Sequence, residues 1–205
     1  MGTSIGRNSM HSLDIDKDGN TELICSASTS GFGTGNYWYI MNYNPTDKTW
    51  NQSWTSTVYS SYIKTIEIVD YNNDNNYEIL LGFDNGTIEI YDPVTKALMK
   101  SYSPVTESVN SIICADADND GINDIVISCP NSTYVLDATT FTKKFTINKG
   151  ANYVRVGVLD DSNKNQIVLS SGYIYKLLGT TLTTEWNFNT SGEGYVELSD
   201  IDKDN

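Results

Sequence analysis

The sequence predicts an all-β fold, a β-propeller built of four-stranded antiparallel blades. An Asp-rich motif starts at residues 14, 70, 116, 158 and 200, close to the ~40–50-residue period of propeller blades. Residues alternate between polar and mostly apolar before each motif, and a short apolar run follows each of the first four. Alternation is typical of a strand with one buried face, and a continuous apolar run is typical of a strand buried on both faces.

Each repeat predicts four strands in order. The first ends at the motif, as with Ile66 and Ile68, and the second is the apolar run after it, as at residues 79–81. The third lies at residues 37–41, 87–91, 133–136 and 173–175, after a turn rich in Gly, Asn or Asp. The fourth places an apolar and an aromatic residue four positions apart on one face. We expect its aromatic residues in the core: Trp54, Tyr102, Phe145 and Trp186.

These strands make four complete blades, approximately at residues 10–58, 59–106, 107–150 and 151–194. Residues 195–205 begin another blade, so we expect residues 1–205 to form a single propeller domain or a fragment of a larger propeller. A first strand without the rest of its blade is an unpaired edge, and unpaired edges favour association. We therefore expect a longer chain or self-association through blade edges. A β-solenoid is the weaker alternative, because its units are usually shorter.

The Asp-rich motifs predict loops that bind Ca²⁺. Calcium takes six to eight oxygen ligands, and alternate residues of a tight loop can point to one side. Carboxylates at positions 1, 3 and 5, a backbone carbonyl at position 7 and an acid at position 9 then surround one ion. The predicted ligands are Asp14, Asp16, Asp18, Asn20 and Glu22 in the first loop; Asp70, Asn72, Asp74, Asn76 and Glu78 in the second; Asp116, Asp118, Asp120, Ile122 and Asp124 in the third; and Asp200, Asp202 and Asp204 in the fifth.

The five loops are not equivalent. Asn75 replaces the glycine of the second loop, and Asn tolerates the left-handed backbone better than most residues. The fourth loop has Val158 at position 1 and only Asp160 as a carboxylate among its ligand positions, because Ser162 and Gln166 follow. We expect it to be empty or weak. The fifth ends before positions 7 and 9. For every loop the alternative is an Asp-rich turn that binds no metal, since Asp also suits turns.

The sequence excludes one other kind of metal site, the EF-hand, and disfavours a second, the zinc site. An EF-hand needs a glutamate at position 12 and flanking helices, whereas Cys25 and Ile127 stand there in the first and third loops, between predicted strands. A zinc site is disfavoured because His11 is the one histidine and no Cys-x-x-Cys pair occurs. The same scarcity, with no nucleophile-elbow motif, argues against a Ser/His/Asp triad, so we expect no enzyme.

The composition argues against nucleic-acid and membrane partners. The chain has 26 acidic and 13 basic residues, a formal net charge of -13, so neither a nucleic-acid footprint nor a polybasic membrane patch is expected. No apolar run approaches the ~20 residues of a membrane helix, and we expect no membrane insertion. Much of the acidity lies in the short loops, which indicates bound cations. Three cysteines, an odd number, argue against a disulfide framework.

With its repeated Asp-x-Asp-x-Asp-Gly-x-x-(Asp/Glu) loops, each followed by an apolar strand, the chain resembles the FG-GAP/VCBS repeat family. These are the calcium-binding propeller repeats of integrin α-subunit heads and of many secreted microbial proteins. The resemblance covers almost the whole chain. It implies an extracellular or cell-surface protein with a ring of seven or eight blades, used for adhesion or as a scaffold. The Phe-Gly and Gly-Ala-Pro segments that name the family are not evident.

We therefore expect a non-catalytic, calcium-binding propeller that acts as an extracellular ligand-binding, adhesion or scaffold module, with a protein or carbohydrate ligand. The alternatives are a structural propeller within a larger carbohydrate-active enzyme and an intracellular assembly scaffold. One segment is a candidate ligand contact. Residues 28–38 form a glycine-rich insertion in which Phe32, Tyr37 and Trp38 would stack on a sugar or a peptide. The alternative is a longer hairpin connection.

Overall fold

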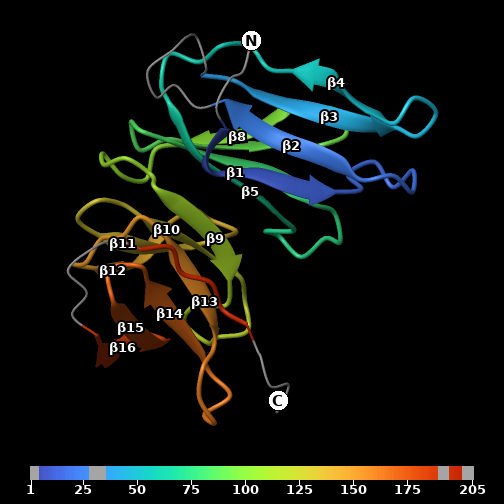
Figure 1. Cartoon of the computed structure of the whole chain (residues 1–205). Helices are drawn as coiled ribbons and strands as arrows, with labels where there is room; N and C mark the ends of the chain where they lie inside the picture. The colour runs from blue at the N-terminus through green and yellow to red at the C-terminus, as the bar shows by residue number, and fades with distance from the viewer. Residues whose placement is uncertain (1–4, 28–35, 189–193, 200–205) are drawn as a thin grey trace. The chain divides into compact units, whose positions relative to one another are not determined.

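The computed structural model describes residues 5–27, 36–188 and 194–199, which form four antiparallel sheets of four strands each (Figure 1). In each sheet the strands are neighbours in chain order. No helix long and apolar enough to cross a membrane occurs in the described part of the chain. The strands are β1 (Ile5–Leu13), β2 (Glu22–Ala27), β3 (Trp38–Asn44) and β4 (Thr49–Thr55); β5 (Ile63–Val69), β6 (Glu78–Phe83), β7 (Ile88–Tyr91) and β8 (Leu98–Tyr102); β9 (Ser111–Ala115), β10 (Asp124–Ser128), β11 (Thr133–Asp137) and β12 (Lys143–Ile147); and β13 (Val154–Val158), β14 (Asn165–Leu169), β15 (Tyr173–Leu178) and β16 (Thr181–Asn187).

The predicted fold class is confirmed: the protein is all-β, and each sheet is a β-propeller blade. Each sheet lies within one predicted blade, except that β1 begins at Ile5, ahead of the predicted start at residue 10. The first four Asp-rich motifs connect the first and second strands of their blades, where the sequence placed them. The chain divides into two compact units, Met1–Ile112 with the first two blades and Ile113–Asn205 with most of the third and all of the fourth.

Burial is greatest in the second strand of a blade and least in the fourth, outer strand. Every residue of β6 and of β10 is buried, as expected for continuous apolar runs. Every residue of β8 is exposed. The expectation that all four outer-strand aromatic residues lie in the core is therefore wrong for two of them: Tyr102 is 38% exposed and Trp186 is 63% exposed. An outer strand has a neighbour on one side only, so the pattern of spacing does not guarantee burial.

Each unit has its own core. In the first unit Ile24, Trp38 and Ile40 pack with Ile79 and Leu81. In the second unit, Val126 and Val135 pack with Ile167, Leu169 and Leu177. The fold is thus stabilised within each unit mainly by β-branched and leucine side chains that the strands of paired blades bring together. None of the three cysteines forms a disulfide, and Cys25 and Cys129 are buried.

Residues 194–199 carry the one predicted strand that the structure does not assign. They lie against β13: the Tyr195 ring packs edge-on against Tyr153 at 4.8 Å between centroids. Arg155 donates hydrogen bonds to Tyr195 at 3.0 Å and Glu197 at 3.2 Å. A strand is defined by backbone hydrogen bonds to a neighbour, whereas these contacts are made by side chains. The rest of the predicted fifth repeat, residues 200–205, lies outside the described residues.

Candidate metal sites and a polar pocket

The first three loops share one backbone arrangement. The carboxylate at position 1 accepts hydrogen bonds from the N–H groups of positions 5 and 6, and the Asp at position 5 accepts one from position 7. The position-1 bonds are Asp14 with Asp18 and Gly19, both 3.0 Å; Asp70 with Asp74 at 3.0 Å and Asn75 at 2.8 Å; and Asp116 with Asp120 and Gly121, both 3.0 Å. Asn20, Asn76 and Ile122, the predicted carbonyl ligands, donate to position 5 at 2.8 Å.

Left-handed backbone makes this arrangement possible. Positions 4 and 6 have positive φ in each of the three loops: Lys17 and Gly19, Asn73 and Asn75, Asn119 and Gly121. Asn and Gly adopt this region at little cost, which explains Asn75 in place of glycine. The fourth loop differs, because within it positive φ is recorded only for Asn163 at position 6. Its backbone therefore does not repeat the turn that gathers the carboxylates of the other three.

The side chain at position 9 ties each loop to the start of the following strand. One of its oxygens accepts the N–H of position 2 in all four blades, at 3.0, 3.4, 3.1 and 2.8 Å. The acceptors are Glu22, Glu78, Asp124 and Gln166, and all four are at most 3% exposed. This bond does not need a charge, since the neutral amide of Gln166 makes it too. The second oxygen of a carboxylate at position 9 is then left for another partner.

The first loop fits a hard cation. Glu22 is 1% exposed, and no hydrogen-bond partner reaches its Oε1 atom. Carboxylate oxygens of Asp14, Asp16 and Asp18 lie within 4.8 Å of one another. Burial raises the pKa of Glu22, and the negative charges of these three aspartates raise it further, against the hydrogen bond from Ile15. A buried, half-satisfied carboxylate beside three others is the donor set that Ca²⁺ takes.

The second loop has the same design with one carboxylate fewer. Asn72 stands at position 3, where its Oδ1 accepts the Asp74 N–H at 3.0 Å and its Nδ2 donates to Asp74 at 3.1 Å. Burial raises the pKa of Glu78 to about 7, and Asp74 and Asp70 raise it as well. The pKa of Asp74 is lowered, chiefly by the Asn76 N–H. The oxygen donors of this loop are of the kind that Ca²⁺ takes, but among the described residues three carboxylates gathered within 4.8 Å of one another occur only in the first and third loops.

The third loop contains a lysine that the sequence analysis missed. The Lys144 ammonium on β12 lies 2.6 Å from Asp118, 3.0 Å from Asp120 and 3.0 Å from Asp124. Burial raises the pKa of Asp124 to about 6, although Lys144 opposes this. The pKa of Asp120 is lowered first by Lys144. Burial alone would lower the pKa of Lys144, but its bonds to Asp118 and the other two carboxylates raise it overall.

The fourth loop has one carboxylate facing a lysine. Asp160 accepts hydrogen bonds from the N–H of Ser162 at 3.0 Å and from its hydroxyl, and its Oδ2 lies 2.9 Å from the Lys176 ammonium. Its pKa is lowered by Ser162 first and by Lys176 next. One carboxylate, one hydroxyl and one amide give too few anionic oxygens for a strong calcium site. The predicted ligands Asp200, Asp202 and Asp204 lie outside the described residues.

The ligand contact expected of the glycine-rich insertion is wrong for Trp38, whereas Tyr37 is partly exposed and its ring centroid lies 6.0 Å from that of Tyr39. Trp38 is fully buried, and its ring lies 4.4 Å from Trp54 and 5.4 Å from Tyr91 between centroids. Its indole N–H donates to the Tyr59 hydroxyl at 3.2 Å. Trp38 therefore belongs to the core and is not available to a ligand. Phe32 and the rest of residues 28–35 lie outside the described residues.

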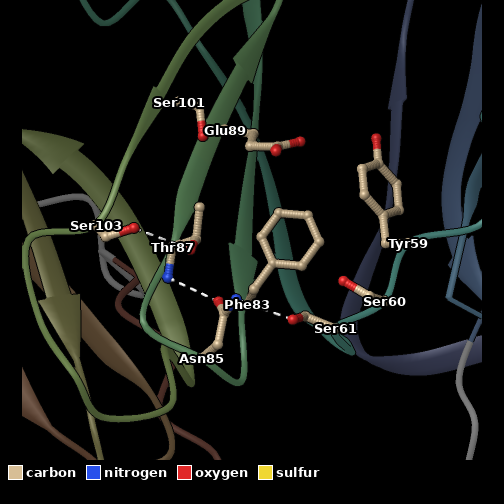
Figure 2. A pocket seen from close by; sticks show the side chains of 9 residues that line it. All are labelled: Tyr59, Ser60, Ser61, Phe83, Asn85, Thr87, Glu89, Ser101 and Ser103. Carbon is tan, nitrogen blue, oxygen red and sulfur yellow. Dashed lines mark hydrogen bonds between the residues drawn. The ribbon is translucent and has the colours of Figure 1, made fainter.

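A polar pocket of about 220 Å³ lies in the first unit, at the end of the second blade opposite its Asp-rich loop (Figure 2). Figure 2 shows the Phe83 ring in its centre, with the side chains of Tyr59 and Glu89 beside it. Asn85 links two walls, because its Nδ2 donates to Ser61 at 2.9 Å and its Oδ1 accepts the Thr87 N–H at 3.0 Å. The remaining lining residues carry hydroxyl groups: Ser60, Ser101 and Ser103.

A chain of hydrogen bonds fixes Glu89 in this pocket. The Tyr91 hydroxyl donates to its Oε2 at 2.6 Å, so the Tyr91 oxygen accepts from Tyr59 at 2.8 Å, and Tyr59 in turn accepts from the Trp38 indole. Among the described residues, none donates a hydrogen bond to the Oε1 atom of Glu89. The sequence could not reveal this pocket, because its residues come from the segment before β5 and from β6, β7 and β8.

Comparison with known proteins supports the fold. No family model matches the chain, and neither does any curated protein sequence. Among solved structures, Sqt1 of Saccharomyces cerevisiae is 15% identical with a TM-score of 0.55, over 87% of this chain and 45% of Sqt1. BBS1N in complex with ARL6DN is 12% identical in a lead-soaked crystal and 13% in a mercury-soaked one. Both have a TM-score of 0.56 and cover 94% of this chain, and 69% and 71% of BBS1N.

At these identities the likeness shows the β-propeller fold alone. The chain spans less than half the length of Sqt1. The resemblance to FG-GAP/VCBS repeats stays a prediction that rests on the loop motifs.

Proposed function

We propose that this chain is a non-catalytic β-propeller module whose first and second blade loops bind Ca²⁺, and that it acts as a ligand-binding, adhesion or scaffold module. The observation that supports it most is Glu22, which is buried, lacks a partner at Oε1 and lies beside Asp14, Asp16 and Asp18. An uncompensated buried charge costs several kcal/mol. A bound cation removes that cost and links β1 to β2.

The donor atoms select the metal. All predicted ligands of the first two loops are carboxylate, amide or backbone oxygens. Hard oxygen ligands suit Ca²⁺, Mg²⁺ and Mn²⁺, whereas zinc and copper favour imidazole and thiolate. Calcium tolerates irregular shells of six to eight oxygens, whereas Mg²⁺ demands a near-ideal octahedron and keeps its waters. A one-turn loop that gathers side chains at positions 1, 3, 5 and 9 therefore favours Ca²⁺.

The metal proposal is tested by thermal unfolding of the whole chain in millimolar CaCl₂, in MgCl₂ and in excess chelator. Calcium bound only to the folded state raises the melting temperature by mass action, and magnesium should raise it less. Identical melting curves in calcium and in chelator would remove the proposal.

We assign the module no catalytic role. The one histidine, His11, has its Nε2 atom 2.8 Å from the backbone carbonyl oxygen of Ile66, which makes it a link between β1 and β5. The same Nε2 atom lies 3.9 Å from the Glu67 carboxylate. An enzyme of the triad type would need a nucleophile in the place of that carbonyl. The module would instead serve a larger protein or a complex as a rigid part.

The affinity for Ca²⁺ distinguishes an extracellular from an intracellular location of the module. We place the module outside the cell or at its surface, where calcium modules have dissociation constants of about 10⁻⁴–10⁻³ M. Titration by isothermal calorimetry gives this constant. A value in the range of cytosolic sensors, about 10⁻⁷–10⁻⁵ M, would favour the alternative of an intracellular assembly scaffold. The other alternative, a structural propeller of a larger carbohydrate-active enzyme, predicts a catalytic domain in the same open reading frame.

The ligand of the module is proposed to be a protein or a carbohydrate, and the polar pocket favours a carbohydrate. One Glu89 oxygen is held by Tyr91 and the other is left to accept, while Ser60 and Ser101 offer hydroxyl groups. Sugars both donate and accept at each hydroxyl, and they pack on aromatic rings such as Phe83 and Tyr59. A pocket of about 220 Å³ is smaller than the ~300–1,000 Å³ of sites for drug-sized ligands, which limits it to about one sugar ring.

Saturation-transfer NMR with a panel of neutral monosaccharides tests this ligand class. Glu89→Gln, which keeps the shape and the Tyr91 contact, should weaken the signal, and Glu107→Gln, outside the pocket, should not. Transfer to no sugar would reject the pocket as a carbohydrate site, and a protein ligand would remain. The BBS1N structures, determined with ARL6DN, are an example of a related fold in a protein complex.

A further inference from the structure

The outer strand of every blade contains one extra residue. The register between the third and the outer strand slips once in each blade, between Ile40 and Met41, Ile90 and Tyr91, Val135 and Leu136, and Ile174 and Tyr175. The residues that the register skips occupy one equivalent place, the bulge position: Ser53, Met99, Lys144 and Glu185. A β-bulge changes the direction of a side chain relative to its strand.

The bulge position carries a cation in the third blade alone. Lys144 reaches Asp118, Asp120 and Asp124 at 2.6–3.0 Å, and two of these aspartates, Asp118 and Asp124, are at most 4% exposed. In the first blade, Ser53 donates to the carbonyl of Ile40 at 3.3 Å. Met99 in the second blade is about half exposed. The first two loops thus receive no positive charge from this position.

The fourth blade uses another position for a similar purpose. Its bulge residue is Glu185, which lies 3.8 Å from the Lys176 ammonium. Lys176 comes from β15 and pairs with Asp160 at 2.9 Å. The one ligand-position carboxylate of the fourth loop is therefore neutralised as well. The two described loops of the second unit each have a lysine partner, and in the first unit no lysine ion pair to a loop carboxylate is recorded among the described residues.

We propose that Lys144, at the bulge position of the third blade, is a built-in counter-cation that makes the third loop independent of metal. The inference rests on the proposed binding of Ca²⁺ by the first two loops. The ammonium contacts three of the four carboxylates that an ion would use. Calcium enters the third loop only when Lys144 leaves, so this loop binds calcium at least about tenfold more weakly than it would without the lysine. Among the four loops that the structure describes, the metal dependence then belongs to the first unit.

Native mass spectrometry at fixed free Ca²⁺ counts the bound ions. Lys144→Met, which copies the residue of the second blade, should bind one ion more than the wild type. Lys144→Arg keeps the charge and should leave the count unchanged. The matched control is Lys143→Met, because the Lys143 ammonium lies 4.5 Å from the Tyr134 ring centroid and not in the loop. The reciprocal change, Met99→Lys, should remove one ion.

Unfolding in chelator gives a second readout. Without metal, Lys144→Met leaves Asp118 and Asp124 buried without a counter-charge, so its melting temperature should fall below that of Lys143→Met. Saturating calcium should close that gap. A gap that calcium does not change would mean that Lys144 contributes packing or hydrogen bonds only, and the proposal would fail.

A separate variant keeps the test valid even if Lys144→Met does not fold. Asp116→Asn removes a third-loop carboxylate that Lys144 does not contact, and in the wild-type background it should cost no bound ion. Loss of one ion would show that the third loop already binds calcium beside its lysine, which overturns the inference. If the wild type binds no ion and Asp14→Asn changes nothing, the proposed function has failed instead.

Discussion

Replacing Glu22 by glutamine separates the structural role of the first loop from its metal site. Glu22 accepts the Ile15 N–H at 3.0 Å, and Gln166 makes the equivalent bond to Leu159 at 2.8 Å with an amide oxygen. Glu22→Gln therefore keeps the bond and removes one of four carboxylates. In chelator the variant should be as stable as the wild type or more stable, because it removes a buried carboxylate with no partner at Oε1.

The pKa of Glu22 explains why Glu22→Gln should not destabilise the chain in chelator. Burial raises the pKa of Glu22 in the folded state, so the folded chain holds this proton more tightly than the unfolded chain. The protonated Glu22 side chain contributes its full stability below the pKa that it has in the unfolded chain. This contribution is lost as the pH rises through the raised pKa of the folded chain. At neutral pH without metal the ionised side chain is a cost, which glutamine does not have.

The stability that the chain gains from calcium should be largely lost in Glu22→Gln. At a free calcium concentration of 100 times the dissociation constant, one site contributes about 2.7 kcal/mol, or roughly 5–11 °C in melting temperature for a chain of this size. Loss of one buried charge partner weakens binding by about a hundredfold. At the same free calcium concentration the site of the variant is then half filled, and its contribution to the free energy of unfolding falls to about 0.4 kcal/mol. This removes roughly 5–9 °C of the rise in melting temperature that calcium causes.

Differential scanning calorimetry at neutral pH, in calcium and in chelator, measures both quantities. Glu107→Gln is the control for the change from glutamate to glutamine outside the loops. An unchanged calcium response in Glu22→Gln would refute the assignment of Glu22 as a ligand. A large loss of stability in chelator would show that its charge is needed for folding and not for metal.

Three further outcomes are expected. Asp160→Asn should leave the calcium response unchanged in calorimetry, because the fourth loop has no other ligand-position carboxylate; an equal loss to Asp14→Asn would contradict this. Gly86→Ala should lower the free energy of unfolding in urea by about 1–3 kcal/mol, because φ is +85° and a Cβ would collide with the Val105 carbonyl. Light scattering on the isolated chain should show self-association through blade edges; a strictly monomeric particle at high concentration would reject it.

The sequence predicted the blades well because their signals are local. The apolar run at residues 79–81 and the motif that begins at Asp70 are contiguous, so period and spacing place β5, β6 and the loop between them. Exposure of the outer strands was less predictable. Trp186 and Trp54 share one spacing, yet Trp186 is exposed and Trp54 packs against the core of the first unit. What covers an outer strand depends on neighbouring blades, which no local pattern records.

The contents of the loops were predictable only in part. Positions 1, 3, 5 and 9 follow from the motif, and the structure brings together Asp14, Asp16 and Asp18 in the first loop and Asp116, Asp118 and Asp124 in the third. Lys144 could not be assigned, because it lies 20 residues beyond Asp124 and reaches the loop through a bulge whose location depends on strand register. The pocket around Glu89 has the same origin, since four separate segments meet there.

The motif therefore combines an observed role in closing the loop with a proposed role in binding metal, and the two differ in their chemical requirements. The bond from position 9 to the N–H of position 2 closes the loop, and the fourth blade retains it with Gln166, a single ligand-position carboxylate and a different turn. Metal binding needs more: a charge at position 9, the left-handed turns at positions 4 and 6, and no lysine among the carboxylates. A loop can keep the first function after losing the second. An Asp-rich motif in a propeller blade consequently indicates a strand connection first, and we propose a calcium site only where no lysine of that blade lies among the carboxylates.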